Sequence, residues 1–135
     1  MANTGNITWQ VSTDGGSTYA TPVTSTYFVA TNNPGVQNIL TYDSNGDQSN
    51  GTSFQPLGIG QANGANESWM GILHLFNPTS AVYYKMFMAR GHRADTYYQD
   101  QWTAGYWKTT SAINAIQFKA GSGNLSGTIK MFGIK

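Results

Sequence analysis

The 135-residue chain has no cysteine, few charged side chains and no long apolar run. Without cysteine it can form neither disulfides nor thiolate metal sites. Charged residues make up 10% of the chain and the formal net charge is +1, with no cluster of Lys or Arg. This balance argues against a nucleic-acid partner, because phosphate binding needs concentrated positive charge. The absence of an apolar run of about 20 residues argues against insertion in a membrane.

Length and the amino terminus narrow the class of protein further. The chain is long enough for one domain with its own core, so residues 1–135 are predicted to form a single domain. The first residues, Met-Ala-Asn-Thr-Gly, have neither the basic nor the apolar region of a secretory signal peptide. We therefore expect a protein that is made in a cytoplasm and is not exported by a signal peptide.

Residues that could carry catalysis are few and scattered. The two histidines are His74, expected in the core or at an interface, and His92. There is no Gly-x-Ser-x-Gly motif and no histidine pair with metal-ligand spacing. Asp95 and Asp100 could serve as the acid and base of a glycosidase, but their spacing in a loop carries no specific signal. We therefore expect no enzyme, no catalytic residue and no cofactor.

Two polar or glycine-rich segments are expected to be loops. Residues 43–47 have the Asp-x-Asn-x-Asp spacing that begins a calcium loop. An EF-hand also needs glycine and glutamate where this chain has Gln48 and Phe54, so residues 43–52 predict an exposed loop and no metal site. The glycines of residues 58–64 miss the dinucleotide-binding spacing, and no amphipathic helix follows them.

The high aromatic content and the alternation of apolar and polar side chains are typical of β-strands. Aromatic residues make up 13% of the chain, and apolar and polar side chains alternate in short segments. Strands are predicted over residues 6–12, 19–30, 36–42, 68–77 and 82–90. No segment keeps a helical period for three turns. Short strands with turns about every eight to twelve residues predict an all-β protein, an antiparallel, jelly-roll-like β-sandwich with essentially no helix.

The last third of the chain predicts a β-hairpin. Its first strand carries Ile113, Ile116 and Phe118, and its second carries Ile129, Met131, Phe132 and Ile134. Between them, Ala-Gly-Ser-Gly-Asn at residues 120–124 tolerates the positive φ angles of a tight turn. We therefore expect the chain to end inside a sheet.

The segment 68–77 is apolar on both faces. Met70, Ile72, His74 and Phe76 alternate with Trp69, Leu73 and Leu75. This pattern predicts a central strand that is covered on both sides, by a second sheet and by a neighbouring subunit. Trp69, Leu73 and Leu75 are the predicted oligomer interface, and the predicted assembly is a homotrimer.

A cationic and aromatic cluster is the predicted contact site. Its members are Arg90, His92, Arg93, Tyr97, Tyr98, Trp102, Tyr106 and Trp107. Such side chains can anchor a protein interface or stack on a glycan. They can also simply pack between strands, and the sequence leaves these three interpretations open.

Several short sequences also carry a family resemblance. They are Ser-Thr-Asp-Gly-Gly-Ser-Thr-Tyr within residues 11–19, Gly-Ile-Leu-His-Leu-Phe-Asn-Pro at 71–78 with Tyr84 and Lys85, Gly-x-Trp at 105–107, Thr-Ser-Ala-Ile-Asn-Ala-Ile at 110–116, and residues 122–134. Together they resemble a group of bacteriophage virion structural domains, found in tail fibres and as small head-decorating proteins. The resemblance implies a virion protein made in the cytoplasm of the host bacterium.

Within that group the resemblance leaves two functions. One is a capsid-decorating, or cement, protein that binds a phage capsid or tail protein and stabilises the assembled shell. The other is a tail-fibre or spike module that recognises glycans on the host surface. The chain has no heptads and no repeat that would form a fibre shaft. We therefore expect the decorating protein.

Overall fold

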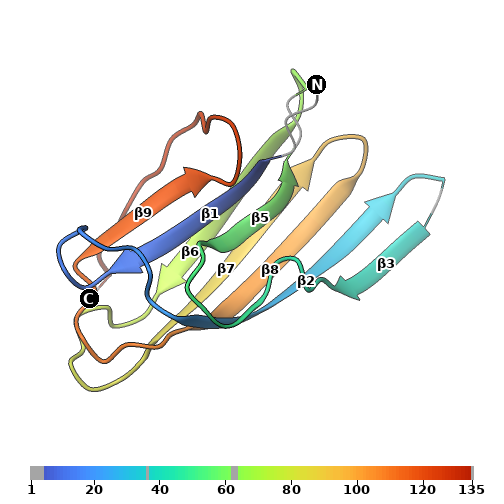
Figure 1. Ribbon diagram of the computed structural model, residues 1–135. Helices are drawn as coiled ribbons and strands as arrows, with labels where there is room; N and C mark the ends of the chain where they lie inside the picture. The colour runs from blue at the N-terminus through green and yellow to red at the C-terminus, as the bar shows by residue number, and fades with distance from the viewer. Residues whose placement is uncertain (1–4, 36, 62–63, 135) are drawn as a thin grey trace.

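Two antiparallel sheets pack face to face in the computed structural model, which describes residues 5–35, 37–61 and 64–134 (Figure 1). Within these ranges the strands are β1 (Gly5–Ser12), β2 (Val23–Asn33), β3 (Gln37–Tyr42), β4 (Gln48–Gly51), β5 (Gln55–Gln61), β6 (Ser68–Leu75), β7 (Lys85–Ala94), β8 (Tyr98–Trp107) and β9 (Ala115–Ala120). The same ranges contain no helix. The predicted all-β sandwich is therefore confirmed.

The two sheets differ in size. The smaller has the order β5-β1-β9, and the larger has the order β3-β2-β8-β7-β6, with β4 also paired to β2. In the larger sheet, β6, β7 and β8 follow one another along the chain, whereas β2 pairs with β8 over the whole length from Val23↔Trp107 to Asn32↔Tyr98. Figure 1 shows the smaller sheet crossing one face of the larger one. The other face of the larger sheet is left uncovered by it.

The core is built around Trp9, which is fully buried on β1 of the smaller sheet. Its ring meets Phe87 at 5.1 Å and Trp107 at 5.0 Å between ring centroids, both nearly perpendicular. Phe87 and Trp107 belong to the larger sheet, on β7 and β8. Edge-to-face pairs of this kind add about 0.5–1.5 kcal/mol each beyond the burial of their area. Aromatic contacts therefore stand at the centre of a core that also contains Val11, Val23, Leu57 and Ile113.

Buried glutamines bind the loops between strands to this core. The Nε2 of Gln10 lies 3.2 Å from the carbonyl oxygen of Thr52. The Nε2 of Gln55 donates to the carbonyl of Gly46 at 2.8 Å, and its Oε1 accepts from the hydroxyl of Ser25 at 2.7 Å. Buried amides need such partners, since an unpaired one costs about 1–3 kcal/mol. The segment expected to be an exposed loop, residues 43–52, is therefore tied to the core and contains the short strand β4.

Trp69, on β6, packs in a slot that is lined by two glycines. The indole of Trp69 lies so close to Gly71 and Gly91 that a Cβ on either would stand 2.5 Å from a ring carbon. Its Nε1 donates to Oε1 of Gln101 at 3.0 Å. Glycine at these positions lets a large ring lie flat on β6 and β7, inside the sandwich.

Several segments form strands that were not predicted. The expected loop at residues 58–64 overlaps β5, and its residues 62–63 lie outside the described ranges. Glycines at 58 and 60 hid this strand, which pairs with β1 through irregular register shifts. Strands β7 and β8 together extend through most of residues 91–103, because the inward side chains there are small or are hydrogen-bonded amides such as Gln101. Residue 36 of the predicted strand 36–42 also lies outside the described ranges.

The predicted carboxyl-terminal hairpin is wrong in its second half. Strand β9 forms, but it pairs with β1 from Ile7↔Ala120 to Ser12↔Ala115. Residues 121–134 contain no strand, and the large apolar side chains among them are 59% to 86% exposed at Ile129, Met131, Phe132 and Ile134. Pairing with β1 occupies only one edge of β9, so it does not exclude a hairpin. The chain instead leaves β9 with the Gly121 amide bonded to the Asn6 carbonyl, and residues 121–126 form no tight turn back onto β9. Ile113 lies before β9 and is buried in the core.

The glycine slot predicts a selective loss of stability. Replacing Gly91→Ala would force the Trp69 ring to move, and such overpacking costs about 1–3 kcal/mol. Gly133→Ala is the matched control, because a Cβ there meets no atom within 4 Å. Urea unfolding of both variants measures the difference, and equal stabilities would contradict the slot.

Candidate interaction surface

The uncovered face of the larger sheet, here called the outer face, is rich in exposed apolar side chains. Along each strand these residues alternate with the buried ones that face the smaller sheet. They include Phe28, Leu40, Tyr42, Met70, Ile72, Met86, Met88 and Tyr98, which are between 39% and 72% exposed. Monomeric soluble proteins rarely expose a contiguous apolar surface of this kind without a function.

Strand register makes this surface continuous. Ile72 lies opposite Arg90, Arg90 opposite Trp102, Trp102 opposite Phe28, and Phe28 opposite Tyr42. Directly opposite residues in antiparallel strands have Cβ atoms about 4.5–5.5 Å apart. One row of side chains therefore crosses five strands, β6, β7, β8, β2 and β3, without a break.

The charges at the centre of the outer face are paired with each other. Arg90 donates from Nε to Oδ1 of Asp100 at 3.0 Å and from Nη2 to Oδ2 at 2.7 Å. This two-pronged hydrogen bond lowers the pKa of Asp100 below its usual value and raises the pKa of Arg90. The guanidinium carbon also lies 4.5 Å from the centroid of the Trp102 ring. The face therefore presents apolar surface around a neutralised ion pair.

The aromatic rings of the outer face cover one another. Trp102 is parallel to Phe28, with centroids 6.0 Å apart and 5° between the planes, and Arg90 covers it from the neighbouring strand on the other side. Tyr106 is stacked on Tyr84 at 5.4 Å. A ring that stacks on a sugar needs a free face, and both faces of Trp102 are occupied, by Phe28 and by Arg90. Trp102 is therefore not free to stack on a glycan.

The structure divides the predicted cationic and aromatic cluster among three places. On the outer face lie Arg90, His92, Tyr98, Trp102 and Tyr106, whereas Arg93 and Tyr97 lie at one end of the sheet and Trp107 is in the core. His92 is hydrogen-bonded through Nδ1 to the hydroxyl of Tyr98. The core-packing interpretation therefore holds for Trp107, and the three interpretations stay open for the other members.

The predicted oligomer interface on β6 faces the smaller sheet and not the outer face. Trp69, Leu73 and Leu75 are half-buried and pack against the core cluster, while Met70 and Ile72 are exposed on the outer face. Among the described residues β6 pairs only with β7, so the prediction of a central strand is wrong and β6 is an edge strand. A role for Trp69, Leu73 and Leu75 in an oligomer interface stays a prediction.

The outer face contains residues that the predicted cluster missed. These are Phe28, Leu40, Tyr42, Met86 and Met88. Alternation along β7 places Met86 and Met88 on one face with Arg90. Phe28, Leu40 and Tyr42 join them only because β2 pairs with β8 and β3, which the sequence did not predict.

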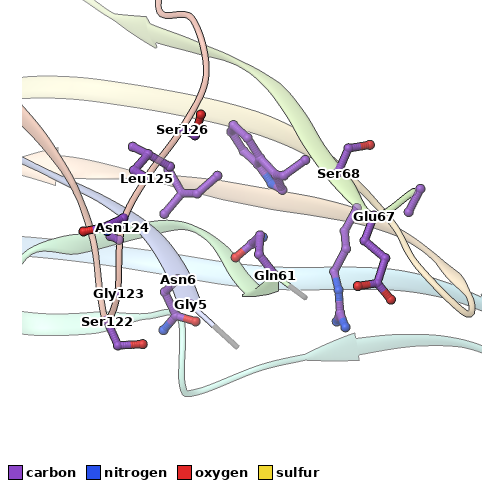
Figure 2. Close-up of a pocket in the computed structure, with 15 residues that line it drawn as sticks. Gly5, Asn6, Gln61, Glu67, Ser68, Ser122, Gly123, Asn124, Leu125 and Ser126 are labelled. Carbon is purple, nitrogen blue, oxygen red and sulfur yellow. The ribbon is translucent and has the colours of Figure 1, made fainter. Parts of the chain in front are cut away.

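A pocket of about 460 Å³ opens at one end of the sandwich. In Figure 2 the loop of residues 122–126 forms one side of it, and Glu67 and Ser68 form the other. Its charged groups already have partners. Arg93 is ion-paired with Asp95 and donates to the hydroxyl of Tyr97 at 3.2 Å, and the carboxylate of Glu67 accepts from the backbone amide of Gly64. The pocket is therefore a weaker candidate than the outer face.

The residues considered for catalysis and metal binding are dispersed. Asp95 and Asp100 are each bound to a different arginine. His74 is exposed on β6 and stacked on Phe76, so it is not in the core. Within residues 5–35, 37–61 and 64–134, no three His, Asp or Glu side chains gather closely enough to hold a metal ion. The same part of the chain has no helix that is long and apolar enough to cross a membrane.

The ion pair of the outer face predicts a change in titration. Replacing Arg90→Gln removes the hydrogen bonds that depress the pKa of Asp100, so this pKa should rise toward the ordinary value. A depressed folded-state pKa stabilises the fold above the unfolded pKa, and that contribution disappears as the pH falls through the folded value. NMR titration of the Asp100 carboxyl measures the shift. Lys130→Gln, distant in sequence and exposed, should leave it unchanged.

No protein-family model, no curated protein and no solved structure matches this chain. Its function is therefore inferred from its own surface chemistry and from the short sequences described above.

Proposed function

We propose that this protein is a structural assembly protein without catalytic activity, which attaches to a larger protein particle through its outer face. One observation carries the proposal: a row of side chains that are apolar or aromatic except for the ion-paired Arg90 crosses five strands, from Ile72 to Tyr42. Aromatic residues, methionine and arginine are the residues that protein interfaces favour at their centres.

The chemistry of the outer face suits a partner that is also apolar. Its central charges neutralise each other, because Asp100 is engaged by Arg90. Attachment should therefore depend little on ionic strength, since salt screens interactions between charges and the central charges of this face already pair with each other. The methionines Met86 and Met88 are flexible and can adapt to an irregular partner surface.

The particle that we propose is a bacteriophage shell, and the protein is then a capsid-decorating, or cement, protein of the virion. The resemblance of its short sequences to phage structural domains supports this identification. A protein that binds only the assembled shell stabilises it by mass action. Both faces of the Trp102 ring are covered, by Phe28 and by Arg90, which supports this function over recognition of host glycans through that ring.

The test is binding of purified protein to shells that lack it. Met88→Asp places a charge in the outer face and should weaken binding roughly tenfold or more, because burying an apolar side chain stabilises a complex by about 1.5–3 kcal/mol. Leu125→Asp is the matched control, since Leu125 is 43% exposed and Met88 is 45% exposed. Thermal unfolding should show that both variants remain folded.

Particles without the protein give the second measurement. Shells that lack it should lose resistance to heat and osmotic shock, and adding wild-type protein should restore that resistance. If such particles are equally robust but no longer adsorb to host cells, the cement function is wrong and the receptor-binding function replaces it.

A further inference from the structure

The carboxyl-terminal segment, residues 127–134, has the composition of a strand but no strand partner within the described chain. Apolar side chains alternate with Thr128 and Lys130, and Ile129 and Met131 are 59% and 73% exposed. Exposure of so many large apolar side chains outside the outer face is unfavourable in water. This segment therefore has the chemistry of a strand that pairs elsewhere.

Strand β9 offers a place for such a strand. It pairs with β1 along one edge, and along the other edge no described residue pairs with it. Ile116 and Phe118 on its inner side are only partly buried, although they pack against the core. An edge strand with free backbone groups is a template for another strand. A strand added here would cover both side chains and satisfy the free backbone groups.

In its own copy the chain after β9 turns back toward the start of β9 but forms no strand pairing with the β9 edge (Figure 1). The amide of Gly121 donates to the carbonyl of Asn6 at 2.7 Å, which holds the exit of β9 against β1. The next residues then cross the end of the sandwich and form one side of the pocket there (Figure 2). The tight turn that a hairpin would need at this point is absent from the described residues 121–126.

We infer that residues 127–134 of one copy add as a strand to the free edge of β9 in a second copy. In an antiparallel pairing, Ile129 and Met131 would face inward beside Phe118, and Thr128 and Lys130 would face solvent beside Gln117. Each copy has one donor segment and one acceptor edge, so the exchange is head-to-tail, and it gives a ring such as the predicted homotrimer when the rotation between copies closes. This inference goes beyond attachment to a shell and does not depend on it.

Engineered cysteines test the pairing directly, because the natural chain has none. Two single variants, Gln117→Cys and Lys130→Cys, are mixed and oxidised under native conditions. Thr128→Cys replaces Lys130→Cys in a second mixture, which tests a pairing shifted by two residues. A disulfide-linked heterodimer of the mixed variants is expected on non-reducing gels. The double variant, carrying both cysteines in one chain, reports pairing within a copy. If no disulfide forms between chains, the inference is overturned, whether or not the double variant closes on itself.

A second experiment measures self-association of the full chain by light scattering. Ile129→Asp combined with Met131→Asp should weaken assembly roughly a hundredfold, because two apolar side chains lose their buried positions. Since both are exposed in the single copy, the thermal stability of the monomer should not fall. Val82→Asp is the matched control, being 69% exposed in another loop. A wild-type protein that stays monomeric at every concentration, or assembly unaffected by the double substitution, would contradict the inference and leave shell binding untouched.

Discussion

The contact of Trp9 with Phe87 and Trp107 is the interaction on which the rest of this structure depends. The smaller sheet has only three strands, so it can cover only part of the larger one. A fully buried tryptophan that meets two aromatic rings at about 5 Å joins the two sheets at the centre of the core. Because β1 carries this residue in the middle of the smaller sheet, both β5 and β9 are held in place through it.

Polar side chains in the interior give the sandwich its specificity. With so few charges available, the chain uses glutamines, and Gln10, Gln55 and Gln101 each donate to a backbone carbonyl in another segment. Lys85 is also fully buried, and its Nζ donates to the carbonyls of Tyr83 and Thr109. Such bonds add little net stability but are costly to leave unmade, so they select one arrangement of the loops.

The same limited coverage produces the surface that we propose as functional. A sandwich whose larger sheet is covered on one side leaves a broad flat face, and this chain fills that face with apolar rings and methionines. Because Arg90 pairs with Asp100 at the centre of this face, a partner that covers the face does not bury an unpaired charge. The free edge of β9 and the exposed segment 127–134 add a second unpartnered feature, on the smaller sheet. Both features fit a protein that works as part of a larger assembly.

The sequence by itself determined the all-β class, the absence of helix and most of the early strands, because a period of two is a local property of the chain. The same period places Trp102 and Trp107 on opposite faces of β8, and Trp69 and Met70 on opposite faces of β6. It cannot say which face is covered, since that depends on where a sheet of only three strands settles. Only the tertiary structure decided that Trp107 and Trp69 face inward and that Trp102 and Met70 face outward. It also decided that β9 pairs with β1, because that partner is more than a hundred residues away along the chain, at Ile7↔Ala120.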